Sequence, residues 1–138
     1  MNKKIIKLLL RLTISVGFLS AVADRFGLWS EKNSVWGNWD RFLEYTQLVN
    51  PWFPNALIQT AAIIATGAEV VFALCLLIGY KTELFARLSG VLLLIFGLAM
   101  ASSTGIKGPL DYSVFTASAA AFALGLMKEK YLEIDSML

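Results

Sequence analysis

One carboxylic acid, Glu69, lies in the middle of a long apolar segment that covers about residues 56–80. If this segment is a membrane-spanning helix, a rise of about 1.5 Å per residue places Glu69 near the midplane of the bilayer. A carboxylate there costs roughly 2.5–3.5 kcal/mol on insertion scales, so we expect it to be neutral, paired with a cation or turned toward a wet cavity. Gln59 and Thr66 share its helical side, and this polar stripe should face the interior of a bundle. The stripe predicts a ligand or proton site, with a structural ion pair as the alternative.

The cation that we expect beside Glu69 is Arg11, which lies inside an apolar segment at about residues 5–27. By helix rise from the ends of the two segments, the depths of Arg11 and Glu69 differ by roughly 7–8 Å, which two long side chains can close. A guanidinium keeps its charge when buried, and its fork matches a carboxylate. The alternative for Arg11 is snorkelling to the inner headgroups.

A second group of polar residues lies where apolar segments end. Asp24 and Arg25 close the first segment, and Asp111 and Tyr112 open a fourth segment at about residues 111–127. Together these four residues predict a polar mouth on the outer side of the bundle. For Asp111 the alternative is a helix N-cap, because aspartate is one of the residues that cap helices well.

The composition excludes most self-contained catalytic chemistry. The chain has no His and a single Cys, Cys75, which excludes imidazole-based triads, His ligation of haem or zinc, and a Cys-x-x-Cys redox pair. We therefore expect no metal site, and we assign no catalytic residue. A formal net charge of +2 gives no electrostatic support for a nucleic-acid partner.

These residues lie in a chain with the composition of a membrane protein. Its 138 residues are 57% hydrophobic and 16% charged, whereas soluble domains are about 45–50% apolar and about 25% charged. Four segments approach the roughly 20 apolar residues that span a bilayer; they lie at about 5–27, 56–80, 84–103 and 111–127. We predict one all-α domain, a four-transmembrane-helix bundle. A cleaved signal peptide is the alternative for the first segment, but we expect that segment to be retained.

The distribution of basic residues predicts the orientation. With both termini in the cytoplasm, eight of the 12 Lys and Arg residues lie on that side, as the positive-inside rule requires. We therefore expect a multi-pass protein of the cytoplasmic (inner) membrane, with residues 28–55 outside. This loop holds all four Trp residues, and about residues 36–50 have helical amphipathic spacing. They predict a short amphipathic helix on the outer leaflet, either an anchor or a lid over a cavity.

Small residues recur at helical spacing on the last two segments. They are Gly90 and Gly97 on one, and Ser113, Ala117, Ala121 and Gly125 on the other. Such faces let helix backbones approach closely inside a membrane. They predict close packing within the bundle, with a second copy of the chain as the alternative contact.

Several short motifs resemble the DoxX family of small integral membrane proteins. The likeness is carried by Leu9-Leu10-Arg11-Leu12, Gly17-Phe18-Leu19, Gly67-Ala68-Glu69 and the run from Leu76 to Thr82, and it covers about residues 8–127. The resemblance implies a four-helix bundle in the cytoplasmic membrane, with Arg11 and Glu69 at the family's polar positions. Some relatives, of the DoxD type, are membrane subunits of a thiosulfate:quinone oxidoreductase, which implies a quinone cofactor and a redox partner.

Three functions are consistent with these residues. The first is the membrane subunit of a quinone-linked redox system for sulfur or thiol compounds, in which the bundle binds a quinone and Glu69 relays a proton. The second is a non-catalytic membrane partner or assembly protein. The third is a small transporter or lipid-handling protein, although no inverted repeat or broken helix is visible. Besides the lipid bilayer, the expected partners are a membrane or periplasmic redox protein and a second copy of the chain.

Overall fold

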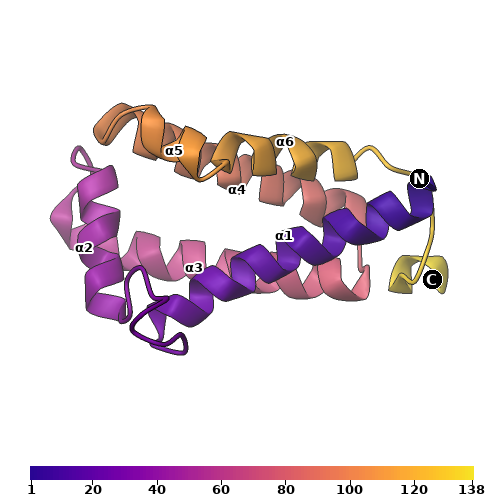
Figure 1. Ribbon diagram of the computed structural model, residues 1–138, viewed down its shortest axis with the longest axis horizontal. Coiled ribbons are helices and arrows are strands. Elements are labelled where there is room, and N and C mark those ends of the chain that lie inside the picture. The colour runs from indigo at the N-terminus through magenta and orange to yellow at the C-terminus, as the bar shows by residue number, and fades with distance from the viewer.

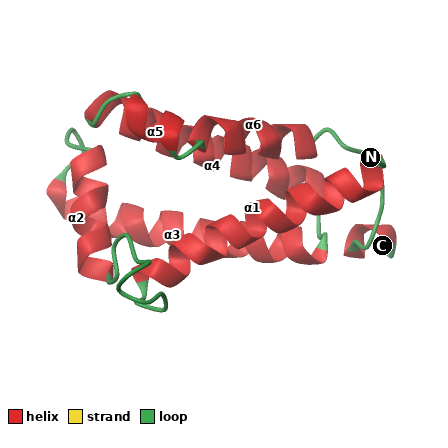
Figure 2. Cartoon of the chain, in the orientation of Figure 1, coloured by secondary structure: helices red, strands yellow, loops and turns green.

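The computed structural model describes residues 1–138, and every regular element in it is helical (Figure 2). The three long helices are α1 (Lys3–Arg25), α3 (Asn55–Ile78) and α4 (Thr82–Ser103). The shorter elements are α2 (Trp39–Val49), α5 (Lys107–Asp111), α6 (Val114–Leu124) and a 3₁₀ turn, η1 (Ile134–Ser136). The all-α prediction is confirmed.

Asparagine caps and a glycine set several helix ends. The side chain of Asn2 accepts a hydrogen bond from the backbone N–H of Lys4 at the start of α1, at 2.9 Å. Asn38 accepts one from the backbone N–H of Arg41 at the start of α2, also at 2.9 Å. Both bonds satisfy donors that have no partner inside the helix. At its other end α3 stops at Gly79, whose φ of +73° is a left-handed conformation that favours glycine.

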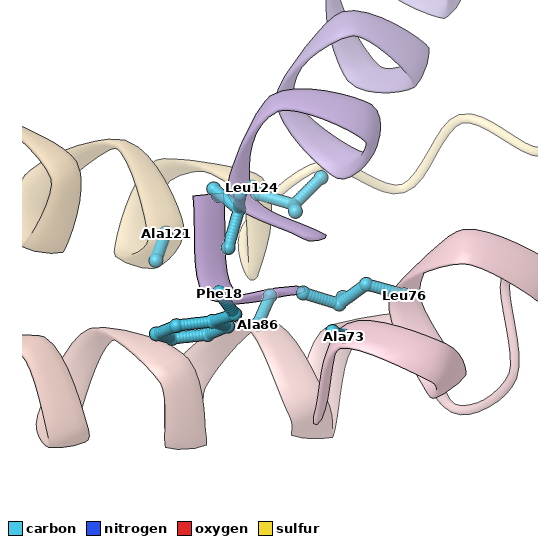
Figure 3. Close-up of a cluster of buried hydrophobic side chains, with 7 residues drawn as sticks. Phe18, Ala73, Leu76, Ala86, Ala121 and Leu124 are labelled. Carbon is cyan, nitrogen blue, oxygen red and sulfur yellow. The ribbon is translucent and has the colours of Figure 1, made fainter. Parts of the chain in front are cut away.

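The helices form a ring in which α1 packs on α3 and α6, and α4 packs on the same two helices (Figure 1). Both chain termini lie at one end of the bundle, the terminal end, and α2 lies across the opposite end, the α2 end (Figure 1). Buried apolar side chains from all four helices form one cluster, which extends from the middle of α1 to the terminal ends of α3, α4 and α6: Ile14, Phe18, Ala73, Leu76, Ala86, Ala121 and Leu124 (Figure 3). Toward the α2 end, the α1–α3 pair and the α4–α6 pair diverge (Figure 1).

The long helices carry large apolar side chains on their outward faces. Val16 on α1, Ile64 on α3 and Ile95 on α4 are examples of exposed residues of this kind. Continuous exposed apolar surface is unusual on soluble monomers. Each of the three helices is long and apolar enough to cross a membrane, and their ends lie within two residues of the first three predicted segments.

The fourth apolar segment differs from its prediction. In place of one helix over about 111–127, α5 and α6 have 5 and 11 residues and lie in line beside α4 (Figure 1). Ser113 separates them because its φ of +56° is left-handed and interrupts the helix. A fourth helix of spanning length is therefore not confirmed, since α6 is well short of roughly 20 residues. The helix predicted over 36–50 corresponds to α2, and its place at a membrane surface stays a prediction.

Glycines on α4 allow close contact with α6. A Cβ at Gly90 would lie 2.9 Å from the ring of Phe122, and one at Gly97 would lie 2.7 Å from the ring of Phe115. Between them, Ser118 Oγ donates a hydrogen bond to the carbonyl oxygen of Gly90 at 2.7 Å. These contacts are within the chain, so the two glycines serve packing of the bundle.

The C-terminal segment, residues 128–138, crosses the terminal end of the bundle, and we call it the strap. Glu133 is only 3% exposed, and its carboxylate lies 2.8 Å from Lys7 Nζ and 3.8 Å from Arg11 Nη1. Arg11 also donates hydrogen bonds to two strap carbonyl oxygens, at 3.0 and 3.1 Å. The strap thus supplies the charge and the acceptors that two buried cations of α1 require.

Asp135 attaches the strap to the start of α4. Its carboxylate accepts hydrogen bonds from the backbone N–H groups of Thr82 (2.8 Å) and Lys81 (2.6 Å). Burial alone would raise the pKa of Asp135, but these donors and the nearby charge of Lys130 hold the pKa below its ordinary value. Because the folded pKa lies below the unfolded one, the stabilisation is complete above about pH 4 and is lost as the pH falls through the folded pKa.

We expect Gly79→Ala to loosen the strap. A Cβ at Gly79 would lie 2.6 Å from Glu133 Cβ and 2.8 Å from Arg11 Nη2, so the strap must move, and the left-handed φ adds about 1–2 kcal/mol. The control is Gly105→Ala, which has a φ of +103° but nothing within 4 Å of its Cβ. Limited proteolysis should cut the strap faster in Gly79→Ala than in the control. Equal cleavage rates would show that the strap does not depend on this contact.

Candidate functional site: an apolar cavity with a buried ion pair

Where the two helix pairs diverge, the bundle contains a cavity of about 750 Å³. All four helices of the ring line it, and α2 contributes to its wall at the α2 end. Of its 25 lining residues 19 are hydrophobic. The small ones leave the space open: Gly17, Ala21, Ala61, Ala62, Ala65, Ala99, Ala117 and Ala120. Small-molecule sites have about 300–1,000 Å³ and mostly apolar walls with a few polar groups. The cavity is therefore the candidate site.

A buried ion pair forms the polar part of the cavity wall. Arg25 and Glu69 are 3% and 1% exposed, and Arg25 Nη1 lies 2.8 Å from Glu69 Oε1. Arg25 Nη2 donates a hydrogen bond to Glu69 Oε2 at 3.1 Å, and Nη1 donates one to Thr66 Oγ1 at 2.8 Å. The last residue of α1 is thereby joined to the middle of α3. A carboxylate in apolar surroundings needs an opposite charge in contact with it, and Arg25 supplies that charge to Glu69.

Aromatic rings cover the guanidinium of Arg25. Its Cζ atom lies 3.9 Å from the ring centroid of Phe42 and 5.3 Å from that of Trp36, within the roughly 6 Å of a cation–π contact. The two rings contact each other edge to face, with centroids 5.1 Å apart. Arg25 therefore connects α3 to α2 and to the loop that precedes α2.

Asp24 organises the loop that carries Trp36. Its carboxylate accepts four hydrogen bonds. The donors are Ser34 Oγ at 2.6 Å and the backbone N–H groups of Val35 (2.8 Å), Trp36 (3.2 Å) and Gly37 (3.2 Å). A single buried carboxylate at the end of α1 thus holds the loop so that the Trp36 ring lines the cavity.

Two buried donors at the cavity have no hydrogen-bond partner in the protein, Nε of Arg25 and Nε1 of Trp36. Buried N–H groups are nearly always paired. Both atoms are covered by the surrounding side chains, so an acceptor on a bound molecule reaches them only when the cavity wall shifts. Tyr45 and Tyr112 line the α2 end of the same cavity. Burial and the neighbouring Tyr112 raise the pKa of Tyr45, so its hydroxyl is protonated and can donate a hydrogen bond at neutral pH.

The expected pairing of Arg11 with Glu69 is wrong. Arg11 lies at the terminal end, where Nε and Nη2 donate to the carbonyl oxygens of Leu76 and Leu77, both at 2.8 Å. These carbonyls are at the end of α3, where a helix leaves acceptors without internal partners. Snorkelling is wrong as well, because Arg11 is 1% exposed. The partner of Glu69 is Arg25, which lies on the same face of α1.

The predicted polar stripe on α3 is confirmed at two of its three residues. Thr66 and Glu69 are buried together at the ion pair, whereas Gln59 is exposed. The difference arises because α1 ends at Arg25, which contacts Thr66 and Glu69, so Gln59, seven residues before Thr66, lies beyond the end of α1. Gln59 is therefore not part of the cavity wall.

The four residues of the predicted outer mouth do not form one cluster. Asp24 and Arg25 are buried at the site, and Tyr112 lines the cavity from the junction of α5 and α6. Asp111 instead forms an exposed ion pair with Lys107, four residues earlier on α5. Asp111 is exposed, and α6 begins without a side-chain cap from it.

The aromatic part of the site was missed from the sequence. The sequence predicts that the Trp residues and the helix over about 36–50 lie at the membrane surface, whereas Trp36, Phe42 and Tyr45 line the cavity. The available signal was the spacing between Trp36, Phe42 and Tyr45, which together form one aromatic cluster. Their contact with an arginine 11 or more residues earlier in the chain depends on the fold of the loop.

The arrangement can bind an apolar molecule and donate hydrogen bonds to it. No group of three or more His, Cys, Asp or Glu side chains could hold a metal ion. Comparisons of the chain with protein-family models, with curated proteins and with solved structures gave no match. Fold and site together define a small all-α protein with three helices able to cross a bilayer and an apolar cavity between them.

Proposed function

We propose that this chain is a DoxX-type protein of the cytoplasmic membrane and binds a quinone in its cavity, as the membrane subunit of a redox system for sulfur or thiol compounds. The observation that carries the proposal is the pair of buried, unpartnered donors, Arg25 Nε and Trp36 Nε1, on the wall of a 750 Å³ apolar cavity. Quinone carbonyl oxygens are acceptors, and the ring and its chain are apolar. The carbonyl oxygens match the two donors, and the ring and chain match the apolar part of the cavity wall.

In this proposal each group at the site has a distinct part. Arg25 and Trp36 orient the quinone head, and Tyr45 offers a further hydroxyl donor. Glu69, ion-paired to Arg25, is the group that exchanges protons with the head when the quinone is reduced. The electrons come from a partner protein, since this chain has one Cys and no His.

The proposed orientation places both termini in the cytoplasm and α2 on the outer side. Its support is the excess of Lys and Arg near the terminal end and the common location of both termini (Figure 1). Lys7 and Arg11 contribute to that excess although the strap covers them. The α5 and α6 segments together form the fourth crossing in this arrangement.

Quinone binding is tested by thermal stability of the purified protein in detergent with decyl-ubiquinone. A ligand at 100 times its Kd adds about 2.7 kcal/mol of stability, so we expect a clear rise in Tm. Ala117→Phe fills the cavity and should abolish the rise, whereas Ala119→Phe, on an exposed position of α6, should retain it. No rise in the unmodified protein at saturating quinone would contradict the proposal. A stoichiometric partner in the same sample would then favour an assembly protein.

A further inference from the structure

We infer that the cavity is reached from the acyl-chain layer through an opening between α1 and α6 at Gly17, and that it takes neutral, chain-bearing lipid-soluble molecules. The inference rests on the cavity of the proposed function and extends it to a route and a wider chemical class. The route through the bilayer and the requirement for a neutral head apply to any molecule that dissolves in the bilayer, and not to quinones alone.

One face of α1 packs on α3. Arg11 bonds to carbonyls of α3, and Arg25, two heptads later, bonds to Glu69 and Thr66 of α3. Ser15, Phe18 and Val22 continue the same stripe and are buried. This seam between α1 and α3 is therefore closed along its length.

The other side of α1 is open to the cavity. Thr13 and Gly17 line the cavity and are nevertheless exposed. A Cβ built on Gly17 has nothing within 4 Å of it. Because this side faces away from α3, the cavity reaches the surface beside α6, whose Ala117 and Ala120 form the opposite wall. In the ribbon, α1 and α6 meet near the terminal end and separate toward the α2 end (Figure 1).

The depth of this opening places it in hydrocarbon. Gly17 is 14 residues beyond the start of α1 at Lys3, which is about 21 Å along a helix of about 35 Å. A bilayer core is about 30 Å thick, so an opening at Gly17 faces lipid chains and not water. Molecules that use it must first dissolve in the membrane.

The polar wall selects against an anionic head. Arg25 carries a positive charge, but Glu69 compensates it at 2.8 Å, and the rings of Phe42 and Trp36 cover the guanidinium. The two donors without a partner, Arg25 Nε and Trp36 Nε1, are buried beside this compensated charge. A carboxylate or phosphate placed there would lie beside the Glu69 carboxylate. A neutral ester or ketone oxygen accepts the same bonds without that repulsion.

The test uses quenching of Trp36 by a stearate methyl ester with a nitroxide near its head. The protein is reconstituted in liposomes, with Trp36 as the only Trp after Trp29, Trp39 and Trp52 are replaced by Phe. We expect the ester to quench Trp36 and the matching free acid to quench about tenfold less at equal membrane concentration. Gly17→Phe should slow quenching by about tenfold or more. Val16→Phe, on a lipid-facing position that does not line the cavity, should leave it unchanged.

Unchanged quenching in folded Gly17→Phe would overturn the opening at α1 and α6 and favour a route past Tyr112. Equal or stronger quenching by the free acid would overturn the neutral class. Thr13→Phe provides a second blocking variant if Gly17→Phe fails to fold. Since the probe is not a quinone, failure of decyl-ubiquinone to stabilise the protein would contradict the proposed function alone.

Discussion

Replacing Glu69 with alanine is expected to lower the free energy of unfolding by about 3–5 kcal/mol, the range for breaking a buried ion pair by removing one partner. The guanidinium of Arg25 would be left buried at 3% exposure with no opposite charge. Arg25→Ala should cost less in electrostatic terms, because Glu69 without its partner can take up a proton. It still loses the contacts of the guanidinium with Thr66 and Phe42. Unfolding in mixed SDS micelles, followed by tryptophan fluorescence, measures these differences.

A double-mutant cycle identifies the partner of Glu69. The Glu69→Ala/Arg25→Ala variant should be milder than the sum of the single variants, because the two groups interact directly. Glu69→Ala/Arg11→Ala should be additive, since Arg11 bonds to strap and α3 carbonyls instead. Glu44→Ala, an exposed carboxylate on α2, is the control and should change stability by less than about 0.5 kcal/mol. Strong coupling of Glu69 to Arg11, with none to Arg25, would contradict the site.

Asp24→Ala is the second large effect that we expect, a loss of about 2–3 kcal/mol. Four donors around residues 34–37 lose their common acceptor. A buried donor left without a partner costs about 1–3 kcal/mol; the sum is reduced because part of the loop is exposed and water can replace some bonds. Asp24→Asn keeps one side-chain oxygen as acceptor and should lose less.

Trp36 reports whether the loop has moved. In Asp24→Ala with Trp36 as the only Trp, its fluorescence should shift to longer wavelength, because the ring leaves the cavity for more polar surroundings. Asp40→Ala, on an exposed position in the first turn of α2, should cost less than about 1 kcal/mol, the usual size of a helix-dipole contact. An unchanged Trp36 spectrum in Asp24→Ala would show that the loop does not depend on this carboxylate.

The long helices could be predicted from local properties. The three segments near 5–27, 56–80 and 84–103 are apolar over a length that only a helix can satisfy within a membrane, and α1, α3 and α4 follow them. The fourth segment could not be predicted in this way. Its residues are small and apolar. The left-handed turn at Ser113 lies beside α4 and depends on packing between helices, which the composition of one segment does not describe.

The identity of the buried acid was also predictable, but its partner was not. Glu69 is the acid in the apolar interior of its segment, and the energy of a carboxylate in hydrocarbon requires a buried partner for it. Arg11 and Arg25 are 14 residues apart on α1, so both lie on the face toward α3. Depth counted from segment ends favoured Arg11. The actual register pairs Arg25 with Thr66 and Glu69, and leaves Arg11 to the end of α3.

The sequence by itself determined the helical class, the three long apolar helices and the presence of a charge that needs a buried partner, because each depends on the solvation of residues near one another in the chain. Only the tertiary structure decided the ion pair of Arg25 with Glu69 and the cavity itself. The same holds for the ion pairs of Glu133 with Lys7 and Arg11. These depend on the register between helices and on where they diverge. That register is set by the sum of many small packing contacts between residues distant in sequence, such as Gly90 with Phe122 and Gly79 with Glu133.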